Sequence, residues 1–416
     1  MLRALIPGGA AVRRDVEAIV AGVRERGDTA LSEYAERFDG IARGTPLRVT
    51  PDELAAALAG LADDVRAGLE LAIENVAAVA GLSVGSDAEV ELPQGQTVRV
   101  RELPVRRAAI YVPGGRAPYP STVVMGAVTA HVAGVEQIVV CAPGADPVIL
   151  AACALCGVEE VYRAGGAHAV AALAYGTEEI ERVDVIAGPG NLYVQEAKRQ
   201  VSGDVGIDGF LGPSDLLVLA GAGAGAELVA LDLEAQAEHG EGTIVVAVSD
   251  DGVLCDTLAE RLADLSPMAI DARDDDFQAF SEGNESGAVA AIVRVADLEE
   301  GLALAEDFAP EHLELVGAAE ALAPRVRSAG CVFVGGASAT AFGDYVAGSN
   351  HSLPTGGAAR FGSALSPRAF RRRMAEVRIG NAAAALAPAG AAIARAEGFE
   401  AHATSMEARV WEDDSQ

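Results

Sequence analysis

Hydrophobic positions in the first hundred residues recur at the three- and four-residue spacing of amphipathic helices. Residues 15–38 carry this spacing and are followed by Asp39 and Gly40, which predicts a helical region that ends there. Residues 51–80 repeat the pattern, and Pro51 and Asp52 are residue types that favour the start of a helix. The N-terminal part of the chain is therefore expected to be helix-rich.

From about residue 98, short β-rich runs alternate with helical segments. In a first series we expect strands in RAAIYV (107–112), QIVVCAP (137–143), EEVYRA (159–164) and VDVIAG (183–188), and helices over 122–133, 148–156, 167–174 and 191–201. In a second series we expect strands in DLLVLA (215–220), TIVVAVS (243–249), AAIVRVA (290–296) and CVFVGG (331–336), and helices over 225–240, 253–264 and 298–308. Such short connections between strands and helices imply right-handed parallel βαβ units.

After Pro367 the pattern becomes helical again, through RAFRRRMAEVRIG and an Ala-rich stretch that ends at Arg395. This tail is too small to form its own core, so it is expected to pack on another surface, and a partner subunit is one candidate. The expected fold class is α/β, with two doubly wound, Rossmann-like parallel-sheet units in series and a small helical C-terminal extension.

Composition narrows the class of protein. Half of the 416 residues are hydrophobic, which is enough for two or more packed units, yet no run reaches the ~20 apolar residues that a membrane span needs. The N-terminus lacks an apolar segment long enough for a secretory signal. The five cysteines are an odd number and lie in apolar runs, which is typical of reduced thiols in a cytosol. A cytoplasmic protein is the expectation.

The charge balance excludes several partners. The net charge is −30, from 61 acidic and 31 basic residues, and Lys198 is the one lysine among the basic residues. Such a field repels nucleic acid and anionic membranes, so we expect neither as a partner. Molar salt screens the self-repulsion beyond ~3 Å, and an acidic surface with almost no lysine favours a halophilic cytoplasm. A GC-rich genome would explain the arginines but not the acidic excess.

One glycine-rich loop matches a nucleotide-binding pattern. Gly221, Gly223 and Ala226 fit G-x-G-x-x-G/A between an expected strand and an expected helix. The match is weak evidence, because the chain contains 47 glycines and alternating Gly and Ala also suits a permissive loop.

Histidine is more informative, because four of the six histidines lie among acids, amides and glycines at the ends of expected elements, where the sites of α/β sheets form: His239, His312, His351 and His402. Gln236 and His239 are three residues apart on an expected helix, so both can face one ion. Glu311 directly precedes His312. Nitrogen and oxygen ligands without thiolates suit zinc or a similar divalent ion. Spacing alone leaves open which of these residues converge.

Several stretches together resemble the histidinol dehydrogenase family, in the family's order and across nearly the whole chain. They include YVPGGRAPYPST (111–122), GPGN (188–191) with EAKRQ (196–200), GPS (212–214), QAEHG (236–240) and APEHLE (309–314). Further matches are residues 165–167, 172–177, 343–345, NHSLPT (350–355) and EGFEAH (397–402). The set as a whole is far more specific than any single motif.

The resemblance implies an activity and a set of site residues. The activity is the oxidation of L-histidinol through L-histidinaldehyde to L-histidine, at the end of histidine biosynthesis, with two NAD and one water. The implied ligands of one Zn²⁺ per subunit are Gln236, His239, Asp344 and His402. Glu311 and His312 are implied as the acid–base residues. The implied substrate contacts are Ser214, His351 and Glu397 together with His312 and the zinc ligands, and the implied NAD contacts are Tyr111, Asn191 and, in the position of a usual Gln, His168.

The resemblance also implies a homodimer with shared active sites, because the family's C-terminal segment reaches the neighbouring subunit. Glu397 and His402 would then complete the partner's site. The expected domains are residues 1–110 with 216–364 as a main domain that carries the zinc and catalytic residues, 111–215 as an inserted domain on the cofactor side, and 365–416 as the extension. The family binds its cofactor without the glycine fingerprint, so the loop from Gly221 to Ala226 is expected not to bind it.

Some positions depart from the family pattern, among them His168 and Asp215, which replaces a usual Glu. These differences leave open a paralogous zinc- and NAD-linked dehydrogenase that acts on another small amino alcohol or polyol. A second alternative is a non-catalytic assembly protein in which zinc holds a dimer together. The Glu311–His312 pair argues against that alternative, since a merely structural metal needs no acid–base pair beside it.

Overall fold

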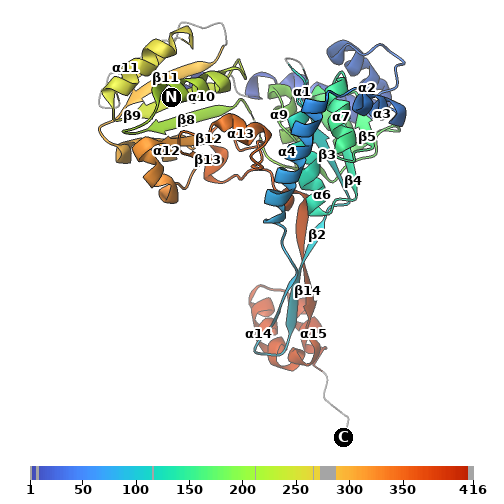
Figure 1. The fold of residues 1–416 in the computed structure, drawn as a ribbon. Helices are drawn as coiled ribbons and strands as arrows, with labels where there is room; N and C mark the ends of the chain where they lie inside the picture. The colour runs from blue at the N-terminus through green and yellow to red at the C-terminus, as the bar shows by residue number, and fades with distance from the viewer. Residues whose placement is uncertain are drawn as a thin grey trace. The chain divides into compact units, whose positions relative to one another are not determined.

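The computed structural model describes residues 2–5, 9–114, 117–210, 212–265, 267–271 and 287–410. The chain divides into two compact units, each of which is traced in Figure 1. We call residues 1–83 with 105–370 the main unit, and residues 84–104 with 371–416 the C-terminal unit. The main unit contains two parallel sheets, and the C-terminal unit contains a small antiparallel sheet with two helices.

The first sheet of the main unit has five parallel strands in the order β5-β4-β3-β6-β7. They are β3 (Arg107–Tyr111), β4 (Gln137–Cys141), β5 (Glu160–Tyr162), β6 (Val185–Ala187) and β7 (Gly206–Ile207). The connecting helices are α5 (Pro120–Val123), continued by the π-helical η4 (Val124–Val128) and α6 (Thr129–Ala133), then α7 (Pro147–Leu155), α8 (Gly166–Tyr175) and α9 (Leu192–Val201). Alternate residues of β3 belong to two different hydrophobic cores, so helices cover both faces of this sheet.

The second sheet has six parallel strands in the order β10-β11-β9-β8-β12-β13. They are β8 (Asp215–Ala220), β9 (Ile244–Ser249), β10 (Met268–Asp271), β11 (Val289–Arg294), β12 (His312–Val316) and β13 (Cys331–Val334). The helices are α10 (Ala226–Ala237), α11 (Gly252–Arg261), α12 (Leu298–Phe308) and α13 (Thr340–Tyr345). Leu216 and Leu217 point into cores on opposite faces, as expected of aliphatic strands that are buried on both sides. The predicted α/β class with two parallel sheets is confirmed, although the sequence pattern does not predict β10 and β12.

The N-terminal helices are α1 (Arg13–Arg26), α2 (Asp28–Tyr34), the π-helical η3 (Ala35–Asp39), α3 (Pro51–Ala59) and α4 (Asp63–Gly81). Helix α1 packs on α8 and α9, α3 packs on α7, and α4 packs on η4 and α6. Their apolar faces therefore complete the two cores of the five-stranded sheet, to which Leu31 and Val76 belong. The expected domains, residues 1–110 with 216–364, 111–215 and 365–416, stay a prediction.

The C-terminal unit is built on an antiparallel sheet in the order β1-β2-β14, with α14 (Ala383–Ala396) and α15 (Glu400–Glu407). Its strands are β1 (Ala88–Glu91), β2 (Thr97–Pro104) and β14 (Arg371–Arg378). The expectation of a helix through RAFRRRMAEVRIG is wrong, since β14 pairs with β2 along its whole length. This partner lies far away in the sequence, and such a tertiary contact overrides local preference. The helical character of the rest of the tail is confirmed over the residues that the structure describes.

Within the described ranges, no helix combines the length and the apolar character that crossing a membrane requires.

Candidate active site

A cavity of about 650 Å³ lies in the main unit, between the edges of its two sheets. One wall follows the carboxyl ends of β3 and β6, where Pro113, Gly114 and residues 189–193 lie. The opposite wall is formed at the amino ends of β8 and β12, by Ser214, Glu311 and His312. The five-stranded sheet thus faces the cavity with the carboxyl ends of its strands, where open α/β sheets usually bind ligands. The six-stranded sheet faces it with the amino ends of its strands.

The helices of the six-stranded sheet bring further polar groups to this cavity. Helix α10 returns to the amino edge of the sheet and ends at Ala237, so that Gln236 and His239 lie near its C-terminus. Helix α13 contributes Asp344, and His351 follows it in the chain. The remaining lining residues are Tyr119, Ser121, Thr122, Gly212, Pro213, Glu241, Gly242, Thr243 and Tyr345. The structure therefore brings together His239, His312, Asp344 and His351, which are far apart in sequence.

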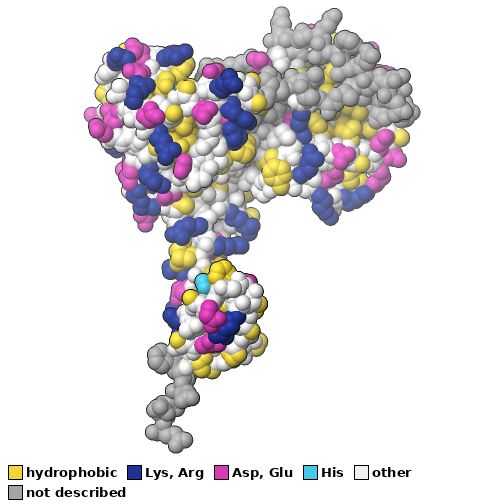
Figure 2. All heavy atoms as spheres, turned by 180° about the vertical axis from the view of Figure 1, so that it is seen from behind, with side chains coloured by type: hydrophobic (Ala, Val, Ile, Leu, Met, Phe, Trp, Pro, Cys, Tyr) yellow, Lys and Arg dark blue, Asp and Glu magenta, His cyan; other side chains and the backbone are white. Residues whose placement is uncertain are grey.

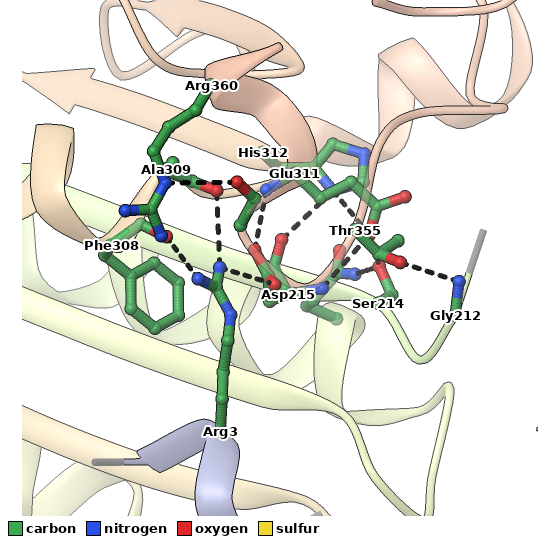
Figure 3. A network of polar contacts seen from close by, with 12 residues as sticks. Arg3, Gly212, Ser214, Asp215, Phe308, Ala309, Glu311, His312, Thr355 and Arg360 are labelled. Atoms are coloured by element: carbon green, nitrogen blue, oxygen red, sulfur yellow. Dashed lines mark hydrogen bonds and ion pairs between the residues drawn. The ribbon is translucent and has the colours of Figure 1, made fainter. Parts of the chain in front are cut away.

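Glu311 and His312 are buried where β12 begins, and Figure 3 shows them with Ser214 and Asp215. The Glu311 carboxylate accepts hydrogen bonds from the Ser214 hydroxyl and from the Asp215 backbone N–H, the latter at 3.0 Å. The Glu311 N–H in turn donates to the Asp215 carboxylate at 2.6 Å. Because every one of these partners sits at the start of β8, the parallel pairing of β8 with β12 sets the position of the Glu311 side chain.

The His312 imidazole lies between two carboxylates. Its Nδ1 is 3.7 Å from Oε2 of Glu311, and its Nε2 is 3.6 Å from Oδ1 of Asp344. Burial raises the pKa of Glu311 to about 7. Burial by itself would lower the pKa of His312, but the negative charges of Glu311 and Asp344 raise it to about 9. The pair can therefore exchange protons with a bound molecule near neutral pH.

Two of the four predicted zinc ligands, His239 and Asp344, line the cavity, and a third, Gln236, contacts Ser214 on its wall. The Gln236 amide nitrogen donates to the Ser214 hydroxyl, so its carbonyl oxygen is not used in this contact. Nδ1 of His239 lies 3.0 Å from the Gln236 backbone carbonyl, a contact that places the proton on Nδ1 and the lone pair on Nε2. Both orientations suit zinc, although the described residues contain no group of three or more His, Cys, Asp or Glu arranged to hold a metal.

Two predicted site residues belong to the other unit. Glu397 follows α14 and His402 lies on α15 of the C-terminal unit, and both are exposed. The side chains of α14 and α15 are held together by Arg395, which forms ion pairs with Glu400 and Glu407. All the residues that line the cavity belong to the main unit, so Glu397 and His402 are not among them.

The predicted cofactor residues differ in their access to the cavity. Asn191 lines it and caps α9, since its side-chain oxygen accepts from the N–H groups of Tyr193 and Val194. Tyr111 lies behind the wall, where its hydroxyl accepts from the Gly166 N–H at 2.9 Å. His168 is buried too, with Nε2 at 2.9 Å from the Asp39 carboxylate, and neither residue is among those that line the cavity.

The glycine-rich loop from Gly221 to Ala226 lies at the carboxyl end of β8, at the opposite end of this strand from Ser214. Its backbone packs against the turn after β12, because the Gly221 N–H donates to Val316 and the Ala318 N–H donates to Ala222. A Cβ atom at Gly221 would lie 2.9 Å from Leu298. Close packing therefore accounts for this glycine, and the loop does not line the cavity.

Sequence reasoning missed the partners that hold these groups in place. Arg3 forms an ion pair with Asp215, Asp39 pairs with His168, and Asp208 pairs with Lys198. Tyr119 and Tyr345, which line the cavity, lie in motifs that the family resemblance included but carried no assigned role. Asp215 and His168 had a signal as departures from the family pattern, and Lys198 had one as the single lysine of the chain, within the matching stretch EAKRQ.

Comparisons with known proteins agree on one family. A family model described as histidinol dehydrogenase matches residues 8–410. A histidinol dehydrogenase of Parasynechococcus marenigrum is 43% identical over 406 residues, which cover 96% of this chain and 91% of that protein. One of Thermobifida fusca is also 43% identical, over 100% of this chain and 95% of its own length.

A solved structure gives the same result. The crystal structure of histidinol dehydrogenase from Elizabethkingia anophelis superposes with a TM-score of 0.86 at 31% identity, over 96% of this chain and 92% of that one. The matches in sequence and in fold span both units of the chain. The chain therefore belongs to the histidinol dehydrogenase family, a family of dehydrogenases.

Proposed function

We propose that the protein oxidises L-histidinol through L-histidinaldehyde to L-histidine, with two NAD⁺ and one water, as the last steps of histidine biosynthesis. The observation that carries this proposal is the buried Glu311–His312 pair at the cavity, beside His239, Asp344 and Gln236. Family membership supports the substrate, and an acid–base pair beside nitrogen and oxygen donors is the chemistry that an alcohol oxidation needs.

His312 in its neutral form takes the proton of the substrate hydroxyl in this mechanism, and this form becomes more populated as the pH approaches its pKa of about 9. Its ring lies between the Glu311 and Asp344 carboxylates, which stabilise the positive charge that the imidazole acquires. NAD⁺ would accept the hydride that leaves the carbinol carbon in each of the two oxidations. His312 therefore removes the proton while the carbon loses two electrons, and a stable charged imidazole favours this transfer.

Glu311 activates the water for the second oxidation. Its pKa near 7, which results from burial, allows the carboxylate to take a proton from water close to neutral pH. Hydrogen bonds from Ser214 and from the Asp215 N–H fix the carboxylate, so one oxygen points in a defined direction. As Glu311 takes a proton from the attacking water, His312 returns its first proton to the aldehyde oxygen, which gives the hydrate. His312, neutral again, then removes one hydroxyl proton of the hydrate as the second hydride leaves, and Glu311 releases its proton to solvent.

We assign one zinc ion per subunit to Gln236, His239 and Asp344 of one subunit and His402 of its partner. Zinc would supply a positive charge that binds and orients the amine and imidazole nitrogens of the substrate. The tautomer of His239 and the orientation of Gln236 support this assignment. Ser214, His351 and the partner's Glu397 would hold the rest of the substrate, since Ser214 and His351 line the cavity.

We assign NAD to the wall built on the five-stranded sheet, and the metal and acid–base residues to the six-stranded sheet. Asn191 lies on this wall. Tyr111 supports it from behind through Gly166, and the pair of His168 with Asp39 fixes the start of α8. In this chain His168 thus acts on the cofactor through the backbone that it positions.

We infer a homodimer with shared sites because the C-terminal unit exposes the residues that such a site lacks. Yellow hydrophobic side chains are visible on the surface of this unit in Figure 2. The exposed hydrophobic residues of the unit include Val377, Ile393 and Phe399. Exposed apolar patches mark interaction surfaces in general. A cytoplasmic location is part of the proposal, and it is supported by the five cysteines, all of them free thiols.

The test is NADH production by the purified, zinc-loaded protein in high salt, with histidinol compared against other amino alcohols. Replacing His312 by Asn should lower kcat by about a hundredfold or more, because a general base contributes at least that much. Zinc content should remain at the wild-type level, since His312 is not a proposed ligand.

A matched control is His131→Asn, because His131 lies outside the cavity and bonds only the Cys156 carbonyl among the described contacts. It should leave turnover unchanged. Near-wild-type rates for His312→Asn, or faster turnover of another amino alcohol than of histidinol, would contradict the proposed function.

A further inference from the structure

The single lysine of the chain is buried. Lys198 lies on α9, and its side chain is 2% exposed. Its ammonium group forms an ion pair with Asp208, whose side chain is 1% exposed, and donates to the Gly188 carbonyl at 2.9 Å. The motif EAKRQ, to which Lys198 belongs, was assigned no role in catalysis or in binding.

The ion pair fixes both polar backbone groups of one residue. While Lys198 binds the Gly188 carbonyl, the second oxygen of Asp208 accepts from the Gly188 N–H at 2.7 Å. Gly188 has a φ of +125°, and a Cβ atom there would lie 2.1 Å from the Tyr111 carbonyl oxygen. This glycine is therefore clamped between the end of β3 and the buried ion pair.

Gly188 begins the segment that forms one wall of the cavity. The next residues, Pro189, Gly190 and Asn191, line the cavity. Gln195 binds the Gly190 carbonyl at 3.0 Å, and the Asn191 side chain caps α9. The first anchor of this wall is thus the pair of Lys198 with Asp208, and the others come from α9 itself.

Lysine suits this place better than arginine does. All other 30 basic residues are arginine. An arginine at position 198 would bring five N–H donors in a rigid fork, whereas the buried site offers one carboxylate oxygen and one carbonyl. A compact ammonium satisfies both, and this explains why lysine occurs here in a chain that otherwise uses arginine.

We propose that Lys198 and Asp208 are positioning residues for the nicotinamide cofactor, because their buried ion pair holds the wall from Pro189 to Asn191 in the shape that the cofactor contacts. This inference rests on the proposed function, in which NAD binds to that wall. It predicts a selective effect. Loss of the pair should weaken the binding of the cofactor. The binding of histidinol and zinc, which contact the other wall, should not change.

The experiment compares Lys198→Met/Asp208→Asn with wild-type protein. The double variant removes both charges, so that neither is left buried alone, which is the costly case. Direct titration with NADH and steady-state kinetics should show a Kd for NADH and a KM for NAD⁺ raised about tenfold or more, as expected from the loss of a charged hydrogen bond. The KM for histidinol and the zinc content should stay within about twofold.

The matched control removes another buried ion pair of the same sheet. Arg107 and Glu160 pair at the amino end of β3, on the edge opposite the cavity, and the Arg107 side chain is as buried as that of Lys198. Arg107→Met/Glu160→Gln should lower the unfolding midpoint in urea but leave the KM for NAD⁺ unchanged. If the Lys198 double variant does not fold, Lys198→Arg provides the same kinetic comparison with the charge retained.

The outcomes separate the two claims. Wild-type protein that neither binds NADH nor oxidises histidinol overturns the proposed function and the positioning role with it. Active wild-type protein with an unchanged KM for NAD⁺ in the variants overturns the positioning role alone. An equal rise of the KM values for NAD⁺ and histidinol, or an equal rise in the Arg107 control, also overturns it, because either result indicates general destabilisation.

Discussion

Replacing Arg3 by Met tests how the acid–base pair is held. Arg3 forms a 3.1 Å ion pair with Asp215 and also donates to the backbone carbonyls of Phe308 and Ala309 (Figure 3). Ala309 has a φ of +48°, which is unfavourable for a residue other than glycine, so these contacts hold a strained turn directly before Glu311. Asp215 binds the Glu311 N–H and carboxylate, so Arg3 acts on Glu311 through Asp215.

The magnitude follows from burial. Removing one partner of a fully buried ion pair costs about 3–5 kcal/mol, because the remaining charge is left in a poorly solvated place. Asp215 is 3% exposed at its side chain, but Arg3 is 24% exposed, so water can partly replace it. We therefore expect Arg3→Met to lower the free energy of unfolding by about 2–3 kcal/mol. In Arg3→Met/Asp215→Asn the loss should shrink to about 1 kcal/mol, since no charge remains buried and the amide oxygen still accepts from the Glu311 N–H.

The assay is urea unfolding in high salt, followed by circular dichroism, with kcat measured on the same preparations. The m-value should not change, because both variants expose the same surface on unfolding. A loss below about 0.5 kcal/mol for Arg3→Met, or an equal loss in the double variant, would refute the reasoning, since it would show that Asp215 needs no cation.

Three further predictions follow from other parts of the structure. Burial and the neighbouring Asp232 raise the pKa of Glu314 to about 9, so the free energy of unfolding should fall as the pH rises from 4.5 towards this value. Glu314→Gln should make the slope between pH 5 and pH 8 in urea titrations shallower than in the wild type, and an unchanged slope would contradict the buried carboxyl group. The net charge of −30 predicts a Tm that rises from low salt to molar KCl, and calorimetry showing no rise would count against the salt-adapted interpretation. Co-expression of His312→Asn chains with His402→Ala chains should restore activity at one of the two sites of the mixed dimer, whereas inactivity of the mixture would refute shared sites.

The fold could be predicted as far as local patterns determine it. The helix expected over 298–308 corresponds to α12 (Leu298–Phe308), and the strand expected over 215–220 corresponds to β8, because their apolar positions repeat with the period of the element. Strand β14 could not be predicted in this way, since its arginine-rich sequence becomes a strand through pairing with β2, more than 260 residues earlier. Strand β12 is not predicted either, because HLELV is short and its first residue, His312, was considered only as a site residue.

The candidate site shows the same division. The types and the spacing of Gln236 and His239 are compatible with a metal ligand pair, and the acid–base role of Glu311 and His312 is what the family resemblance implies. The sequence could not show which of these residues lie together in the folded chain. Asp215 meets Glu311 only because β8 and β12 are adjacent in the sheet, and Arg3 and Asp39 reach their partners from segments that local patterns do not connect to the site.

The central claim is that one cavity carries out two successive oxidations of one substrate. The most direct measurement is the number of NADH molecules formed per histidinol consumed by the zinc-loaded protein in high salt, with the product identified by mass spectrometry. We predict two NADH and histidine, because Glu311 and His312 take protons first in the oxidation of the alcohol and then in that of the hydrated aldehyde. One NADH with release of the aldehyde, or no NADH at all, would contradict it.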